Sequence, residues 1–199
     1  MKSQEPKSLS GRELPTLIVE PPGPASRQLA ETLAQYESPG ISTISAGDIP
    51  IFWAEAKGSS VLDVDSNTYL DLTSAFGVAS IGHAHPKVTK AIAQQAKQLI
   101  HGMGDIYPHP LRVELAKTLA DITPGNLQKC LFGNTGAEAV ELALKTAARF
   151  TGKPGVIAFQ GAFHGQSYGA LQVTSRRTFR DQFMSGMSQN VVHAPYPNC

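Results

Sequence analysis

Cysteine is scarce in this chain of 199 residues, which contains only Cys130 and Cys199. Two cysteines exclude the disulfide framework that small secreted proteins need. The first residues also lack the long apolar run of a signal peptide or a membrane span. These absences predict a reducing, cytoplasmic location and no membrane partner.

An excess of charge of one sign is also missing. The 17 basic residues nearly balance the 16 acidic residues, and the net charge is +1. No basic run carries interleaved aromatic residues, so we expect no nucleic-acid partner. The hydrophobic fraction of 41% is enough to build the core of one domain or of two small ones. The remaining candidates for partners are small molecules and proteins.

The first part of the chain predicts a leader followed by a small antiparallel sheet. Residues 1–27 are polar and rich in proline, a composition that does not fold alone, and we interpret them as a leader. A short helix is expected at residues 28–37. Alternating apolar residues then flank the turn Asp65-Ser66-Asn67, which predicts short antiparallel strands. Two helices are expected next, at residues 86–99 and from Pro110 to Asp121.

From residue 129 onward the pattern changes to alternating strands and helices. Such alternation predicts an α/β fold with parallel strands joined by helical crossovers. In sheets of this kind ligands bind at the carboxyl ends of the strands. Two glycine-containing loops occupy such positions, residues 133–136 and 160–165, so we expect the site between them. The predicted elements are strands at residues 129–132, 156–159 and 191–194 and a helix at 137–151 that Gly152 ends.

The first loop has the features of a phosphate-binding helix start. The N–H groups at the beginning of a helix have no intrahelical partner, and the helix dipole favours an anion there. Thr135 adds a hydroxyl, and Gly136 and Ala137 offer N–H groups with little side chain in the way. The loop has neither the P-loop nor the dinucleotide-binding spacing, so a single terminal phosphate fits better than a nucleotide. The alternative is a simple turn and helix cap, with Glu138 complementing the dipole.

The second loop, "GAFHGQ" at residues 161–166, offers an aromatic ring and an imidazole beside glycines. Phe163 could stack on a planar ligand, with His164 next to it. The alternative is that Phe163 belongs to the core and His164 is a hydrogen-bonded loop residue. The pair His83 and His85 has no acidic or thiol partner at ligand spacing, so we predict no metal site.

Four separated motifs resemble one protein family. They are "LDVDSNTYLDLTSAFGVASIGHAHPKV", "GNTGAEAVELALKTAARFTGKPGVIAF", "GAFHGQSYGAL" and the late "APYP". In order and spacing they are similar to the N-terminal part of class III pyridoxal-phosphate aminotransferases, with particular similarity to the 4-aminobutyrate and acetylornithine aminotransferase branch. The resemblance covers about residues 50–197.

The resemblance implies a fold-type I pyridoxal-phosphate-dependent transferase. Its large domain has a mostly parallel sheet of which this chain carries an incomplete part, and its small domain includes an N-terminal segment. In that frame residues 1–27 are the leader, residues 28–80 belong to the small domain and residues 81–199 begin the large domain. The family also implies a homodimer with active sites at the interface.

The resemblance assigns roles to the two loops. Residues matching Thr135, Gly136 and Ala137 hold the phosphate of pyridoxal 5'-phosphate in the family. The aromatic residue matching Phe163 stacks on the pyridine ring, and the histidine matching His164 lies beside the cofactor. One ligand with one phosphate and one planar ring therefore accounts for both loops.

Two departures from the family pattern matter. Gln166 stands where many relatives have arginine; it is a candidate substrate contact, but its neutral amide cannot bind a carboxylate as a fork. The lysine that bonds the cofactor and the aspartate at its ring nitrogen are expected after the "PYP" segment. We therefore predict no catalytic residue within these 199 residues and no activity of the chain alone.

Three functions follow from this comparison. The first is an aminotransferase that moves an amino group from an amine or amino acid donor to a 2-oxo acid. The second is another reaction on the same fold, as in an aminomutase, an epimerase or a decarboxylase, because a fold does not determine a reaction. The third is an inactive fragment that only binds pyridoxal phosphate.

Overall fold

The computed structural model describes residues 9–38, 48–104, 106–187 and 190–197. Its contacts divide the chain into two compact units, residues 1–102 and 103–199. The second helix that the sequence predicts, at residues 86–99, therefore falls in the first unit. The predicted domain boundary after residue 80 stays a prediction. Among the described residues, no helix has the length and apolar character needed to cross a membrane.

The first unit contains a three-stranded antiparallel sheet, as the sequence predicts. The strands lie in the order β1-β2-β3. Val61 pairs with Ala56 on one side and with Tyr69 on the other, and its side chain is buried. The strands are β1 (Trp53–Lys57), β2 (Ser60–Asp63) and β3 (Thr68–Leu70), and the helices of this unit are α1 (Pro24–Tyr36) and α2 (Pro86–Gln98).

The expected start of the first helix at residue 28 is wrong, because α1 begins at Pro24. The Asp65 carboxylate accepts hydrogen bonds from the N–H groups of Ala25, at 2.7 Å, and Ser26, at 2.9 Å. Thr16, further back in the predicted leader, forms a bridge with Thr68. This polar stretch is therefore attached to the hairpin through hydrogen bonds, which an argument from apolar content alone does not detect.

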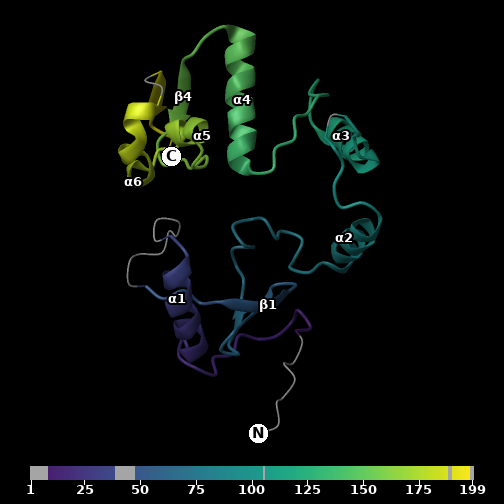
Figure 1. The fold of residues 1–199 in the computed structure, drawn as a ribbon, viewed down its shortest axis with the longest axis vertical. Coiled ribbons are helices and arrows are strands. Elements are labelled where there is room, and N and C mark those ends of the chain that lie inside the picture. Colours follow the sequence, from purple (N-terminus) through teal and green to yellow (C-terminus); the bar gives the residue numbers. More distant parts are fainter. Residues whose placement is uncertain (1–8, 39–47, 105, 188–189, 198–199) are drawn as a thin grey trace. The chain divides into compact units, whose positions relative to one another are not determined.

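The second unit is built around two parallel strands. In the ladder Val156 pairs with Val191 and Phe159 with Ala194, as the alternating pattern predicts. The short helix α5 packs against α4 and against both strands, and its Ala170, Leu171 and Val173 side chains are buried (Figure 1). The elements are α3 (Pro110–Ile122), α4 (Gly136–Thr151), β4 (Val156–Phe159), α5 (Tyr168–Val173), α6 (Arg177–Arg180), the 3-10 helix η1 (Asp181–Gly186) and β5 (Val191–Ala194).

Gly152 ends α4 as predicted, in a left-handed conformation with φ of 67°. The strand predicted at residues 129–132 is wrong, because this segment forms no ladder. In the described part of the second unit β4 and β5 pair only with each other. A short apolar run becomes a strand only when a neighbour supplies hydrogen bonds, so sequence pattern alone overestimates it here.

Candidate functional site

Two side chains, those of Thr135 and Glu138, accept hydrogen bonds from backbone N–H groups at the start of α4. The Thr135 Oγ1 atom accepts a hydrogen bond from the Glu138 N–H group at 3.1 Å. The Glu138 carboxylate accepts from the backbone N–H and the side-chain amide of Asn134, at 2.5 and 3.1 Å. This exchange is close to a capping box, so the loop does cap the helix, as one of the two interpretations expects.

The cap leaves part of the helix start open. The N–H groups of Gly136 and Ala137 lie in the first turn, where the helix itself has no acceptor for them. A Cβ atom built on Gly136 would meet nothing within 4 Å. There is thus space beside Gly136 at the positive end of the helix dipole, an environment that favours an anion. The Thr135 cap uses the N–H group of Glu138 and not those of Gly136 and Ala137.

The second loop lies against this helix start. Gly165 has φ of +126°, and a Cβ atom there would lie only 2.7 Å from the Ala137 Cβ atom. A side chain at this position would push the loop away from α4. Glycine is thus required both by its backbone conformation and by the close approach. The structure brings the two loops together, as the sequence predicts.

A buried threonine that the sequence analysis does not select holds the shape of the second loop. The Thr174 side chain is fully buried, and its Oγ1 atom accepts from the His164 N–H group at 2.9 Å. The same hydroxyl lies 3.0 Å from the carbonyl oxygens of Gly165 and Ala170, either of which can accept its proton. No spacing in the sequence identifies this role, because it depends on the fold of the loop.

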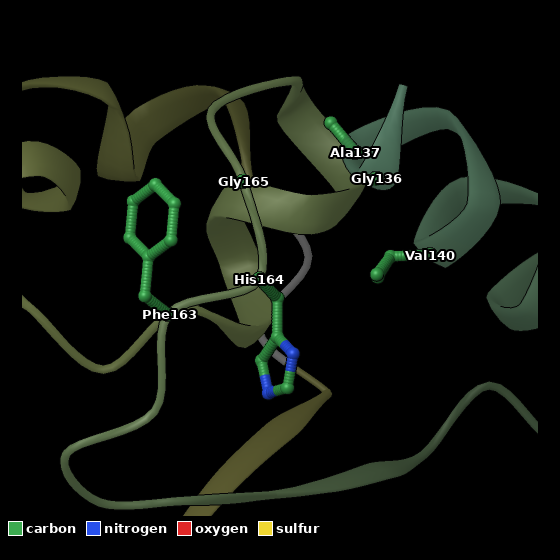
Figure 2. A pocket seen from close by; sticks show the side chains of 6 residues that line it. All are labelled: Gly136, Ala137, Val140, Phe163, His164 and Gly165. Carbon is green, nitrogen blue, oxygen red and sulfur yellow. The ribbon is translucent and has the colours of Figure 1, made fainter. Parts of the chain in front are cut away.

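A cavity of about 420 Å³ lies between the two loops. Phe163 is 52% exposed among the described residues, and its ring meets the Phe179 ring edge-on. Its role in stacking on a ligand stays a prediction. Figure 2 shows the Phe163 ring and the His164 imidazole extending to opposite sides of the loop. The lining residues are Gly136, Ala137, Val140, Phe163, His164 and Gly165 (Figure 2).

Four of the predicted site residues therefore share one cavity: Gly136, Ala137, Phe163 and His164. Thr135 acts beside it as the cap of α4 and does not line it. Gln166 is exposed and also lies outside the lining residues. Among the described residues, no lysine lines the cavity, and no group of three or more histidine, cysteine, aspartate or glutamate residues is placed to hold a metal ion.

Comparison with solved structures identifies the class of fold. The chain is similar to taurine:2-oxoglutarate aminotransferase from Bifidobacterium kashiwanohense, solved in complex with PLP and glutamate, with 26% identity and a TM-score of 0.76. The match covers 87% of this chain and 38% of that chain. The fold is thus the α/β fold of fold-type I transferases, and this prediction is confirmed.

The family follows from the sequence comparison. The family model Aminotransferase class-III matches residues 41–199, and the chain belongs to this family. It is 39% identical over 150 residues to acetylornithine aminotransferase from Methanosarcina acetivorans, covering 75% of this chain and 37% of that protein. It is 35% identical over 187 residues to alanine/serine racemase from Pyrococcus horikoshii, covering 94% of this chain and 39% of that protein. The chain spans about two fifths of the length of these relatives.

Proposed function

We propose that this chain supplies the pyridoxal-phosphate-binding part of an aminotransferase. The reaction moves an amino group from an amine or amino acid donor to a 2-oxo acid. The observation that carries the proposal is the cavity in which an open helix start and an exposed aromatic ring lie together. Membership of the class III aminotransferase family and the aminotransferases among the relatives support the same function.

The residues present fit this cofactor. The N–H groups of Gly136 and Ala137 suit a phosphate, and the space beside Gly136 leaves room for its oxygens. No carboxylate lines the cavity among the described residues. The Glu138 carboxylate is bonded to Asn134, which keeps it engaged in the cap. The volume of about 420 Å³ lies in the range of small-ligand pockets.

When bound, pyridoxal phosphate supplies an electron-accepting ring that stabilises negative charge at the carbon bearing the amino group. The contribution of this chain is to bind and orient. The helix start of α4 would hold the phosphate, and the exposed Phe163 side chain would offer a face for stacking. His164 is among the lining residues, and its imidazole can donate or accept a hydrogen bond. Gln166 stays a proposed substrate contact, from its place next to Gly165.

The 199-residue chain alone is proposed to bind the cofactor reversibly and to catalyse no transamination. No described lysine lines the cavity, and the family resemblance implies that the lysine bonded to the cofactor lies elsewhere. Borohydride reduction followed by peptide mapping tests this point. We expect labels scattered over several surface lysines, and one dominant labelled lysine would contradict the proposal.

The binding proposal is tested with two ligands that differ by one group. Equilibrium dialysis of the chain against pyridoxal 5'-phosphate and against pyridoxal compares binding with and without the phosphate. We expect pyridoxal to bind at least about tenfold more weakly, because charge-assisted hydrogen bonds to the phosphate are lost. Equal affinity for the two ligands would refute a phosphate site at the start of α4.

A racemase or epimerase is the second candidate function, because a relative of 35% identity over 94% of this chain is an alanine/serine racemase. Product analysis separates the two reactions in a protein that carries this chain together with a complete catalytic site. An aminotransferase converts its donor to an oxo compound and aminates the acceptor. A racemase keeps the nitrogen on the same molecule and inverts its configuration.

A cytoplasmic homodimer completes the proposal. It is supported by the family resemblance, which implies active sites at a subunit interface, and by the cysteine content. Light scattering of such a complete protein measures its mass in solution. A mass of one subunit at micromolar concentration would contradict the dimer.

A further inference from the structure

Glu141 lies in the middle of α4, one helical turn after the cavity residue Ala137. Its carboxylate contacts the segment at the start of α5. The Oε1 atom accepts a hydrogen bond from the Ser167 hydroxyl at 2.8 Å and another from the Gly169 N–H group at 2.6 Å. The pKa of Glu141 is lowered, first by the Ser167 hydrogen bond and, among smaller causes, by the Gly169 N–H group and the nearby Lys145. The carboxylate is therefore bonded in its ionised form.

The partner of Glu141 is shaped to receive it. A Cβ atom at Gly169 would collide with the Glu141 carboxylate, so only glycine leaves this space free. Ser167 and Gly169 stand at the start of α5, where N–H groups lack intrahelical acceptors. Glu141 thus caps a neighbouring helix from the side of α4. Sequence spacing gives no sign of this contact, because the partners lie 26 and 28 residues apart.

This contact attaches the second loop to the helix that carries the first. Among the described residues, the hydrogen bonds that join α4 to the loop and to α5 both end on Glu141. Thr174 bonds the loop to itself and to α5 but not to α4. The packing of Gly165 against Ala137 adds contact without a hydrogen bond.

We infer that Glu141 is a positioning residue for the proposed cofactor site, an inference that rests on the proposed function. By holding α5 against α4, Glu141 fixes how far the Phe163 and His164 loop stands from the N–H groups of Gly136 and Ala137. A ligand with a phosphate at one end and a planar ring at the other needs both parts at a set separation. Inorganic phosphate needs only the helix start.

The test compares pyridoxal 5'-phosphate with inorganic phosphate as probes of the full 199-residue chain. Glu141→Ala removes both hydrogen bonds, and we expect the Kd for pyridoxal phosphate to rise about tenfold. Glu141→Gln keeps an oxygen acceptor but loses the charge, and we expect about a threefold rise. The Kd for inorganic phosphate should stay within about twofold in both variants, because the N–H groups of Gly136 and Ala137 remain.

Glu114→Gln is the matched control. Glu114 is exposed on α3 and has no role in the proposed site, so this variant makes the same change of charge without touching the loop. It should leave both Kd values unchanged. Circular dichroism in the absorption band of bound pyridoxal phosphate provides a second readout, because it reports how the ring is held. We expect this signal to weaken in Glu141→Ala at saturating ligand and not in the control.

The outcomes separate the two proposals. If the unchanged chain binds no pyridoxal phosphate, the proposed function fails and the inference with it. If the unchanged chain binds it and Glu141→Ala binds it equally well, only the inference is overturned. Equal weakening of both probes would also overturn it, because Glu141 would then only support α4. If Glu141→Ala does not fold, Ser167→Ala is the second variant, because it removes one donor to Glu141 at an exposed position. A threefold rise in the Kd for pyridoxal phosphate supports the inference, and an unchanged Kd overturns it.

Discussion

The hairpin turn of the first unit and the start of α4 in the second are built from similar residues, with opposite results. In the hairpin, the buried Asp63 carboxylate accepts four hydrogen bonds, from the Asp65 and Asn67 N–H groups, the Asn67 amide and the Tyr69 hydroxyl. The fully buried Asn67 side chain in turn accepts from the N–H groups of residues 18 and 19. Short polar side chains here consume the hydrogen-bonding groups of the turn.

At the start of α4, similar polar side chains accept hydrogen bonds from only some of the backbone N–H groups. Thr135 accepts a hydrogen bond from the Glu138 N–H group and Glu138 accepts one from Asn134, while the N–H groups of Gly136 and Ala137 have no acceptor within the helix. The difference shows how turn chemistry divides between structure and binding. A turn whose donors all find internal acceptors adds stability, whereas a turn with spare donors beside a cavity can bind an anion.

The largest effect should come from breaking the saturated turn. Asp63→Ala leaves several buried donors without an acceptor, and we expect the free energy of unfolding to fall by at least about 3 kcal/mol. Urea unfolding measures this change. Asp48→Ala, at an exposed position, is the control and should change the free energy by less than about 0.5 kcal/mol. Similar small losses for both variants would show that the network at Asp63 is not a main source of stability.

A second substitution places a side chain in the open space at the start of α4. Gly136→Asp places a carboxylate where a phosphate is proposed, and we expect the Kd for pyridoxal phosphate to rise about a hundredfold by charge repulsion. The fold should tolerate it, because nothing lies within 4 Å of the new Cβ atom and an acidic residue suits the first helical turn. Dialysis and thermal unfolding measure the two effects. An unchanged Kd, or a loss of stability larger than the loss of binding, would break the comparison between the two turns.

The contrast between the turns also explains what the sequence predicts. The helix at Pro110–Ile122 and the end of α4 at Gly152 follow from local signals, proline at a helix start and glycine at a helix end. The two loops at the cavity were found in the same way. The helix boundaries depend on residues close together in the chain, and local sequence patterns predict such features well. The pairing of β4 with β5 joins distant segments and follows from the alternation of strands and helices.

The features that sequence reasoning missed depend on distant partners. The helical pattern predicts that Glu141 faces solvent, whereas in the fold its carboxylate accepts a hydrogen bond from Ser167. The early start of α1 at Pro24 depends on Asp65, which follows 40 residues after Ala25. The segment at residues 129–132 fails as a strand for the opposite reason, since no ladder partner is present among the described residues. Side-chain caps from distant residues and strand neighbours depend on the fold, and local spacing does not encode them.

A smaller effect is expected from the aromatic side of the cavity. Phe163→Leu keeps an apolar side chain but removes the stacking face, and we expect pyridoxal phosphate binding to weaken by about 1 kcal/mol, or roughly fivefold. Thermal stability should change little, because the ring is half exposed. Phe179→Leu is the control variant. The Phe179 ring packs edge-on against the Phe163 ring, with 5.8 Å between the ring centroids, but Phe179 does not line the cavity. A loss of stability without a loss of affinity in Phe163→Leu would assign Phe163 to packing alone.

The smallest effect should come from a second saturated carboxylate in the first unit. The Asp71 Oδ2 atom lies 2.7 Å from His83 Nε2, and its carboxylate also accepts from Thr73 and Ala75. The His83 hydrogen bond, with the smaller help of Thr73 and Ala75, lowers the pKa of Asp71 from 3.8 to about 2. A pKa that is lower in the folded state stabilises the protein above the unfolded value and loses this contribution as the pH falls from 3.8 to about 2.

Asp71→Asn tests this dependence. The variant should unfold at a lower temperature than the unchanged chain at about pH 5, and the gap between them should narrow toward about pH 2. The gap reports on Asp71, because the titration of the other acidic residues is common to both proteins. Comparing the two proteins at each pH cancels that shared titration. A difference in unfolding temperature that stays constant with pH would contradict the prediction. It would mean that the negative charge of Asp71 adds no stability beyond what a neutral amide of the same shape provides.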